Sequence, residues 1–456
     1  MQFVDNLDSS SPIVNDAFRD KARGLRPFYF IVVAWGKRYS DFLCNYCIPS
    51  LLSPNNIPAL LNSGNKFVIA TTDEDWVRMK ARPIFRLLEQ YVEPVFIRVP
   101  PCPPEANKYL HMGIGHKLAT HLAFEDRAYA AVLTPDLMVS DGTVSALQQH
   151  AIDGVQLVLT AALRFGEEPL FEHLKQMGIA TLDSRSDDEA RALVVTSRQL
   201  VSAGLRSFHS ETLSYEWETP YFASSPVAVW WRVPDEDGII VHSLSWAPLL
   251  IDYDTVRHHD TLGMDDCSID GDYIHRNFGL NGKVHIVQDS DEMMLMSWGA
   301  LDASAVSLEA RQALKNIFLG GWEKSMALHN EIFHQQTDPL KREIFSKPVF
   351  WHVRDINDRW RITEKEAAKV VNKTKFAGPI RKALFTYIPK GRALIKRHKE
   401  GLSGYLKSTF VYYYENRRHV WNLVKQALHG DPVAKNRIKQ SLRLFVAYLV
   451  GDPNKK

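Results

Sequence analysis

Short apolar runs rich in β-branched residues alternate with helical patterns along the first third of the chain, and this alternation constrains the fold more than any other feature. The predicted strands are Phe28–Trp35, Asn65–Thr71, Val92–Val99, Tyr129–Leu133 and Val155–Leu163. Between them, apolar residues recur at the spacing of a helix that faces a core, and one such helix is predicted from Asp75 to Tyr91. Continuous apolar runs fit strands buried on both faces, and strands that alternate with helices form parallel sheets. We therefore predict an α/β fold with a mostly parallel sheet and helices on both faces.

Two carboxylates follow the fourth predicted strand. The strand leads into the triplet Thr134-Pro135-Asp136, where the proline cannot donate to a sheet ladder and turns the chain out of the sheet. A helical pattern begins soon after, so we expect Ser140 or Asp141 to be its N-cap. Ligands in open α/β sheets bind at the carboxyl ends of the strands. Asp136 is therefore the first candidate for a ligand contact, whereas Asp141 is favoured as a cap.

The charge of the chain is distributed unevenly. The 456 residues carry a formal charge of only +2, yet residues 364–456 hold 21 lysines and arginines against 6 acidic residues. Aromatic residues are interleaved with these basic ones, a composition that suits an interfacial helix at an anionic membrane surface. Docking against the acidic body or an oligomer contact ranks second, and nucleic acid is the least favoured of the three. The length itself predicts more than one domain.

Targeting signals and disulfide patterns are not evident in the sequence. No stretch approaches the ~20 apolar residues of a membrane span, and the first residues lack the pattern of a secretory signal. We therefore expect a cytoplasmic protein, with a peripheral position on the inner membrane face if the basic tail binds lipid. Four cysteines are too few for a disulfide framework. The Cys44-x-x-Cys47 motif has no second half, which favours buried thiols on a helix over a redox or zinc site.

On these features, residues 28–164 resemble the nucleotide-sugar half of GT-A glycosyltransferases. The resemblance lies in FYFIVVAWG, in FVIATTDED, and in AAVLTPDLMVSDGTVSALQQHA, where that family carries its D-x-D motif. The Thr134-Pro135-Asp136 triplet retains only the final acid. The resemblance implies a Rossmann-related, GT-A-like catalytic domain over 26–300, with a nucleotide-sugar half at 26–164 and an acceptor half at 165–300. A helical extension at 301–363 and the basic helical tail at 364–456 would follow.

The resemblance also implies a metal site for the donor. Asp136 would hold a divalent ion, Mn²⁺ or Mg²⁺, on the diphosphate of a nucleoside-diphosphate sugar, because such ions take hard oxygen ligands. His242 would supply a third ligand or a phosphate contact, although a histidine at a strand end is more often structural. The missing first acid leaves a metal-free alternative, in which arginines, lysines and helix amides neutralise the diphosphate.

Further donor contacts follow from the same resemblance. Trp35, Gly36 and Tyr39 would line the base and ribose, Asp73 would contact the nucleoside, and Lys117 would lie near the phosphates. A core role for Trp35 is an equal alternative, because aromatic residues at strand ends also pack inward. For Lys117 a solvated helix position is the more frequent arrangement.

An acid-dense loop from Asp265 to Asp272 is the predicted source of a catalytic base. Inverting glycosyl transfer requires a carboxylate that removes the proton from the acceptor hydroxyl. Asp270 is the first candidate and Asp272 the second. The loop does not have the spacing of a calcium-binding loop, and an exposed acidic turn remains the alternative.

Taken together, the sequence predicts a glycosyltransferase that moves a sugar from a nucleoside-diphosphate sugar to a glycan or lipid-linked acceptor in cell-surface polysaccharide synthesis. A sugar nucleotidyltransferase is a second hypothesis, but WGKRYSD after the first strand is not a glycine-rich phosphate loop. A non-catalytic glycan-binding or assembly protein on the same scaffold is a third. The sequence contains no G-x-S-x-G, Walker A or H-E-x-x-H motif.

Overall fold

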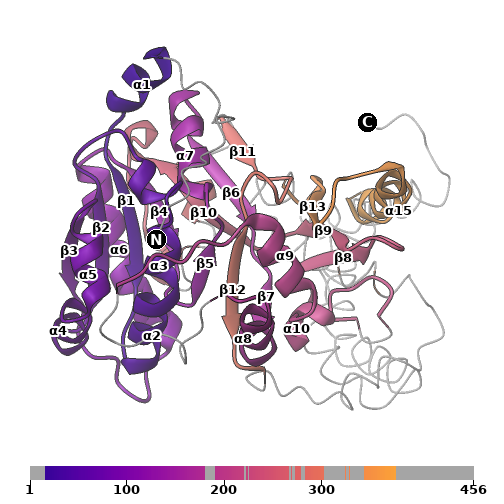
Figure 1. Ribbon diagram of the computed structural model, residues 1–456, viewed down its shortest axis with the longest axis horizontal. Coiled ribbons are helices and arrows are strands. Elements are labelled where there is room, and N and C mark those ends of the chain that lie inside the picture. The colour runs from indigo at the N-terminus through magenta and orange to yellow at the C-terminus, as the bar shows by residue number, and fades with distance from the viewer. Residues whose placement is uncertain are drawn as a thin grey trace, which may run out of the picture.

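The computed structural model describes residues 16–179, 190–219, 222–223, 225–265, 269, 273–278, 283–301, 324, 328 and 344–375. The N-terminal part of the chain forms most of a seven-stranded sheet and the helices that cover it. Two three-stranded sheets lie beside the large sheet (Figure 1). Within these described ranges, no helix combines the length and apolar character needed to cross a bilayer.

The seven-stranded sheet confirms the prediction of a mostly parallel α/β sheet. Its strands, in spatial order, are β11 (Val284–Ile286), β6 (Leu157–Ala161), β10 (Trp246–Asp252), β4 (Tyr129–Leu133), β1 (Phe28–Val33), β2 (Lys66–Thr71) and β3 (Glu93–Arg98). All are parallel except β10, which runs antiparallel between β4 and β6. The first four predicted strands match β1 to β4 within two residues at each end. The central strand β1 is buried along its whole length, as its continuous apolar run indicates.

Helices cover both faces of this sheet. On one face lies α6 (Lys108–Glu125), whose Ala119 and Ala123 pack with Tyr29 and Ile31 of β1. The other face is covered by the π-helical turn η1 (Leu43–Cys47), α3 (Ile48–Leu51), α5 (Pro83–Leu88) and α7 (Thr143–Ile152), whereas Phe42 of α2 (Lys37–Phe42) belongs to the first core. The two faces therefore form two separate cores, as expected for a sheet wrapped on both sides.

Two small sheets extend the fold. The first contains β5 (Leu137–Val139), β12 (Leu295–Gly299) and β7 (Arg164–Gly166), with β12 in the centre. The second is antiparallel and contains β13 (Val349–His352), β9 (Gly238–Ser243) and β8 (Ala228–Arg232). The remaining helices are α1 (Asp16–Arg23), α4 (Asp73–Lys80), α8 (Glu167–Gln176), α9 (Ser197–Leu205), α10 (Ser210–Leu213), α11 (Tyr273–Phe278) and α15 (Asp358–Lys375), with 3-10 turns at Ile57–Ala59, Tyr253–Thr255 and Leu262–Asp265.

The start of the basic tail belongs to α15. This helix buries Trp360, Ala367 and Val371, which recur at helical spacing and pack against β8 and β9. Residues 364–375 are therefore held in part by intramolecular docking. The rest of the predicted membrane-binding tail, residues 376–456, lies outside the described residues.

Local expectations were corrected at two points. A single helix predicted over 75–91 is two helices, α4 and α5, because Pro83 starts a new helix at N1. The N-cap of α7 is Gly142, at φ +93°, rather than Ser140 or Asp141. Asp141 instead accepts hydrogen bonds from the backbone amide of Asn55 (2.9 Å) and from its side chain (2.6 Å).

Cys44 and Cys47 are buried free thiols in η1, as predicted. Burial raises the pKa of Cys44 to about 12 and raises that of Cys47 further. A buried thiol of high pKa is a poor nucleophile and a poor metal ligand, so these residues have a packing role.

Candidate functional site

The strand order of the large sheet defines where a ligand site is expected. From β1 the chain proceeds to β2 and β3 on one side, whereas β4 pairs with the other side of β1. The loops that leave the carboxyl ends of β1 and β4 therefore diverge, and this switch point is the usual ligand position in open α/β sheets. The loop after β1 contains Trp35 and Gly36, and the loop after β4 contains Asp136.

Asp136 lies where the chain passes from the large sheet into the first small sheet. Its carbonyl accepts a hydrogen bond from the backbone amide of Trp298 in β12 (3.4 Å). Burial raises the pKa of its carboxyl group; the hydroxyl of Thr134 and the guanidinium groups of Arg164 and Arg38 act in the opposite direction without cancelling the effect. Burial therefore favours the neutral form of this carboxyl group, and a metal-binding role for Asp136 stays a prediction.

Tyr39 and Arg38, in the segment that follows β1, interact electrostatically with Asp136. The Tyr39 side chain is half exposed and packs edge-on against Phe42, with ring centroids 6.2 Å apart. Burial and the charge of Asp136 raise the pKa of its hydroxyl. Arg38 is paired with Glu167, the first residue of α8. Of the predicted residues, Tyr39 and Asp136 are therefore brought together, and Arg38 and Arg164 join them although the sequence did not single them out.

Asp75 rather than Asp73 fixes the loop after β1. Gly36, at φ +80°, donates its backbone N–H to Oδ2 of Asp75 (2.8 Å), and the Thr72 hydroxyl donates to the same oxygen (2.8 Å). Asp75 is buried, whereas Asp73 is exposed and forms an ion pair with Arg98 at 2.8 Å. Asp75 therefore shapes the loop, and a nucleoside contact by Asp73 stays a prediction.

Trp35 is partly buried at the carboxyl end of β1. It packs against the buried cluster of Val33, Ala70 and Val99 and meets the ring of His111 edge-on, with centroids 5.1 Å apart. The partly buried position fits the core role considered for Trp35, and its contact with a base or ribose stays a prediction. Lys117 lies in the middle of α6 and is partly buried, and its contact with phosphates stays a prediction.

His242 belongs to a different part of the fold from Asp136. It is buried in β9, where its Nδ1 lies 2.9 Å from the carbonyl oxygen of Phe345 and its ring packs edge-on against Trp231. This environment supports the structural alternative, and His242 does not enter the site that we propose below. The predicted bases Asp270 and Asp272 lie outside the described residues.

Two other groups of side chains have the donor atoms for a metal ion. Among the described residues these are His150, His285 and Glu292, and Asp289, Asp291 and His352. Neither group includes Asp136. Each group combines residues of the segment 285–292 with one distant histidine, His150 or His352, so no spacing motif pointed to them, although the acids at 289–292 stand out as a cluster.

The chain was also compared with known proteins. No protein-family model matches it, and no curated protein matches it.

Proposed function

We propose that the protein is a glycosyltransferase that uses a nucleoside-diphosphate sugar and binds its diphosphate at the switch point between β1 and β4. The observation that carries the proposal is the position of Asp136, a partly buried carboxylate beside Arg38, Arg164 and Tyr39 at the carboxyl end of β4. This combination offers one anionic group for a cation and two cationic groups for phosphate oxygens. The resemblance to GT-A enzymes over residues 28–164 supports the same assignment.

The chemistry divides into two parts. A divalent ion held by Asp136 and the diphosphate would neutralise the charge that develops on the leaving group, and the two arginines would add to this effect. Arginine suits the second task because its planar fork forms paired hydrogen bonds with phosphate oxygens. The acceptor, a glycan or a lipid-linked sugar, would be deprotonated by a carboxylate of the Asp270–Asp272 segment.

A thermal-shift panel of nucleoside diphosphates with and without Mn²⁺ tests the binding part of this proposal. A ligand present at 100 times its dissociation constant stabilises the fold by roughly 2.7 kcal/mol. We expect the Mn²⁺-dependent part of the shift to disappear in Asp136→Asn, because the amide removes the anionic ligand without changing the shape of the side chain. Asp153→Asn, at an exposed position after α7, is the matched control and should retain the full shift. An unchanged Mn²⁺-dependent shift in Asp136→Asn would contradict the metal-binding role.

Activity separates the three hypotheses. Release of nucleoside diphosphate from a nucleotide sugar, with or without an added acceptor, supports transfer. Release of pyrophosphate from a nucleoside triphosphate and a sugar phosphate would indicate a nucleotidyltransferase instead. Binding of a glycan without either reaction would identify the third class, a binding or assembly protein.

A further inference from the structure

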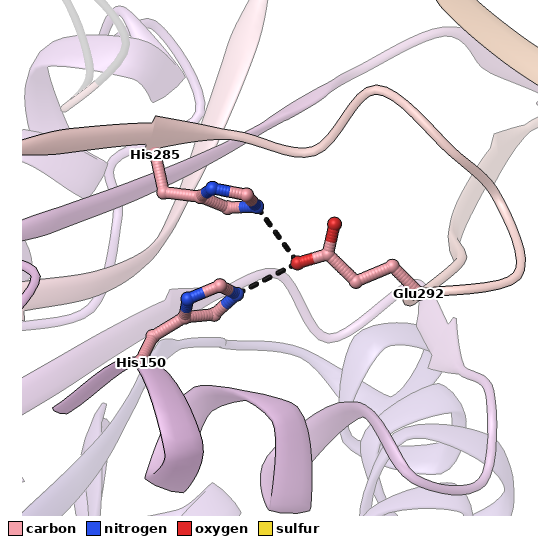
Figure 2. A group of neighbouring side chains, drawn as sticks. All are labelled: His150, His285 and Glu292. Atoms are coloured by element: carbon pink, nitrogen blue, oxygen red, sulfur yellow. Dashed lines mark hydrogen bonds and ion pairs between the residues drawn. The ribbon is translucent and has the colours of Figure 1, made fainter. Parts of the chain in front are cut away.

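Three side chains from distant segments converge near the edge strand β11 (Figure 2). His150 lies in the last turn of α7, His285 lies in the middle of β11, and Glu292 lies in the turn between β11 and β12. His285 is paired in register with Val158, near the amino end of β6. The group is therefore separate from Asp136, which follows the carboxyl end of β4.

The donor atoms of these three side chains point at one another. The Nε2 atom of His150 lies 2.7 Å from Oε1 of Glu292, and that of His285 lies 2.8 Å from the same oxygen. The two imidazole rings face each other with centroids 4.1 Å apart. One donor atom from each residue falls within 4.8 Å of the other two. All three residues are partly exposed, so an ion can reach them from solvent.

The charge of Glu292 suits a cation. Burial would raise the pKa of its carboxyl group, but hydrogen bonds from His150 and His285 outweigh burial and lower the pKa to about 2. Both histidines approach the carboxylate through Nε2. In the neutral tautomer with the proton on Nδ1, the Nε2 atom has a free lone pair that can bind a metal ion.

We propose that His150, His285 and Glu292 bind one divalent transition-metal ion of the zinc class. Two imidazole nitrogens and one carboxylate form a common three-ligand zinc set that leaves a fourth position for water. With metal–ligand bonds of about 2.0–2.1 Å in a tetrahedral site, the donor atoms lie about 3.3 Å apart. The present separations from Oε1 are roughly half an ångström shorter, a difference that small rotations of exposed side chains can supply. Imidazole donors favour Zn²⁺, Co²⁺ and Ni²⁺ over Mg²⁺ and Ca²⁺.

The neighbouring group on the same turn is less suited to an ion. Arg198 lies 2.6 Å from Oδ2 of Asp291 and 2.6 Å from Oδ1 of Asp355, so a guanidinium already neutralises this carboxylate pair. His352 lies 2.8 Å from Oδ1 of Asp289 and 2.8 Å from the carbonyl oxygen of Arg354. A metal ion at this second group would have to displace the arginine. A metal ion at the first group would displace no arginine or lysine.

An ion at the first group would join α7, the strand β11 and the turn that follows it. The strand β11 is three residues long, partly exposed, and forms the edge of the large sheet. The ion would connect this edge to α7 and to the turn that leads into β12. It would therefore protect β11 from local opening, which amide hydrogen exchange measures directly.

Calorimetric titration of the metal-stripped full chain with Zn²⁺ tests the proposal. We expect one ion per chain, and at least about 10-fold weaker binding in Glu292→Gln and His285→Gln. The control variants His173→Asn, a partly exposed histidine on α8, and Asp291→Asn, in the second group, should bind as the wild type does. Asp136→Asn should also retain Zn²⁺ binding, which distinguishes this site from the proposed donor site.

Co²⁺ provides a second readout that does not depend on the folding of any one variant. Bound at two imidazoles, a carboxylate and water, it should give the intense visible absorption of a four-coordinate ion, and Zn²⁺ should displace it. Increased hydrogen-exchange protection of residues 284–286 should accompany loading. Absence of Zn²⁺ binding by the wild type, full binding in both ligand variants, or loss of binding only in Asp291→Asn would each overturn the proposal.

Discussion

The close approach of α6 to β1 and β2 yields a prediction that depends on packing alone. A Cβ atom at Gly115 would lie 2.6 and 2.9 Å from the two methyl groups of Val33 and 3.0 Å from Cβ of Ala70. Real Cβ contacts are essentially never shorter than 3.0 Å. Both neighbours are buried at the carboxyl ends of their strands. The helix must therefore shift in Gly115→Ala.

The expected loss of stability follows from two opposing terms. Overpacking a well-filled core costs typically 1–3 kcal/mol, and alanine recovers about 1 kcal/mol over glycine in a helix. Because the contact of 2.6 Å lies well below the 3.0 Å limit, the upper part of the overpacking range applies, about 2–3 kcal/mol. After the recovery of about 1 kcal/mol, we expect Gly115→Ala to lower the free energy of unfolding by about 1–2 kcal/mol. Val33→Ala alone should cost about 2 kcal/mol, because it removes two buried methyl groups and leaves a cavity.

A double-mutant cycle measured by urea unfolding tests whether a methyl group at position 115 and the side chain of Val33 compete for the same volume. In Val33→Ala with Gly115→Ala, the new methyl group occupies space that the valine vacated, so the two losses should be less than additive by at least about 1 kcal/mol. Additive losses would show that Gly115 and Val33 do not compete for the same volume. A single variant Gly115→Ala as stable as the wild type would contradict the predicted clash itself.

Two further predictions concern protonation and thiol chemistry. Burial and the neighbouring His121 lower the pKa of His259 to about 4, so the unfolded chain takes up a proton at a higher pH than the folded chain does. Allowing for partial exposure, we expect neutral His259 to contribute about 1–2 kcal/mol to the free energy of unfolding above pH 6.5. This contribution is lost as the pH falls through 4. Urea unfolding at pH 7 and at pH 4.5 should show a smaller difference for His259→Gln, and an unchanged difference would contradict this role. Cys44 and Cys47 should resist Ellman's reagent at pH 8, whereas the partly exposed Cys102 should react. Site-resolved mass spectrometry measures which thiols are modified. Rapid modification of either buried thiol in the native protein would be inconsistent with their raised pKa values.

The strands of the large sheet were largely predictable, because burial on both faces leaves a continuous apolar run. Phe28–Trp35 and Tyr129–Leu133 correspond closely to β1 and β4. The orientation of β10 was not predictable, because nothing local in Trp246–Asp252 states that it inserts antiparallel between β4 and β6. Such a placement is decided by tertiary pairing, which a local pattern does not encode.

The candidate sites divide in the same way. Asp136 was predictable because a proline marks the end of its strand, and Tyr39 followed from the loop after the first strand. Arg164 was not, because it reaches Asp136 only through the packing of β7 beside β5 and β12. His150 and His285 are separated by 134 intervening residues and meet only because β11 pairs with β6.

The insertion of β10 has a consequence for how the protein is made. On the ribosome, β4 and β6 emerge well before residues 246–252, and at ~5–20 residues per second the interval from residue 164 to residue 252 lasts roughly 4–18 s. Throughout that time the strand that separates them has not been synthesised, so two apolar edges have no partner. Exposed edges of this kind recruit other chains or chaperones. Expression of residues 26–164 alone would leave these edges permanently unpaired, so any attempt to isolate this part of the fold should extend the chain at least past Asp252.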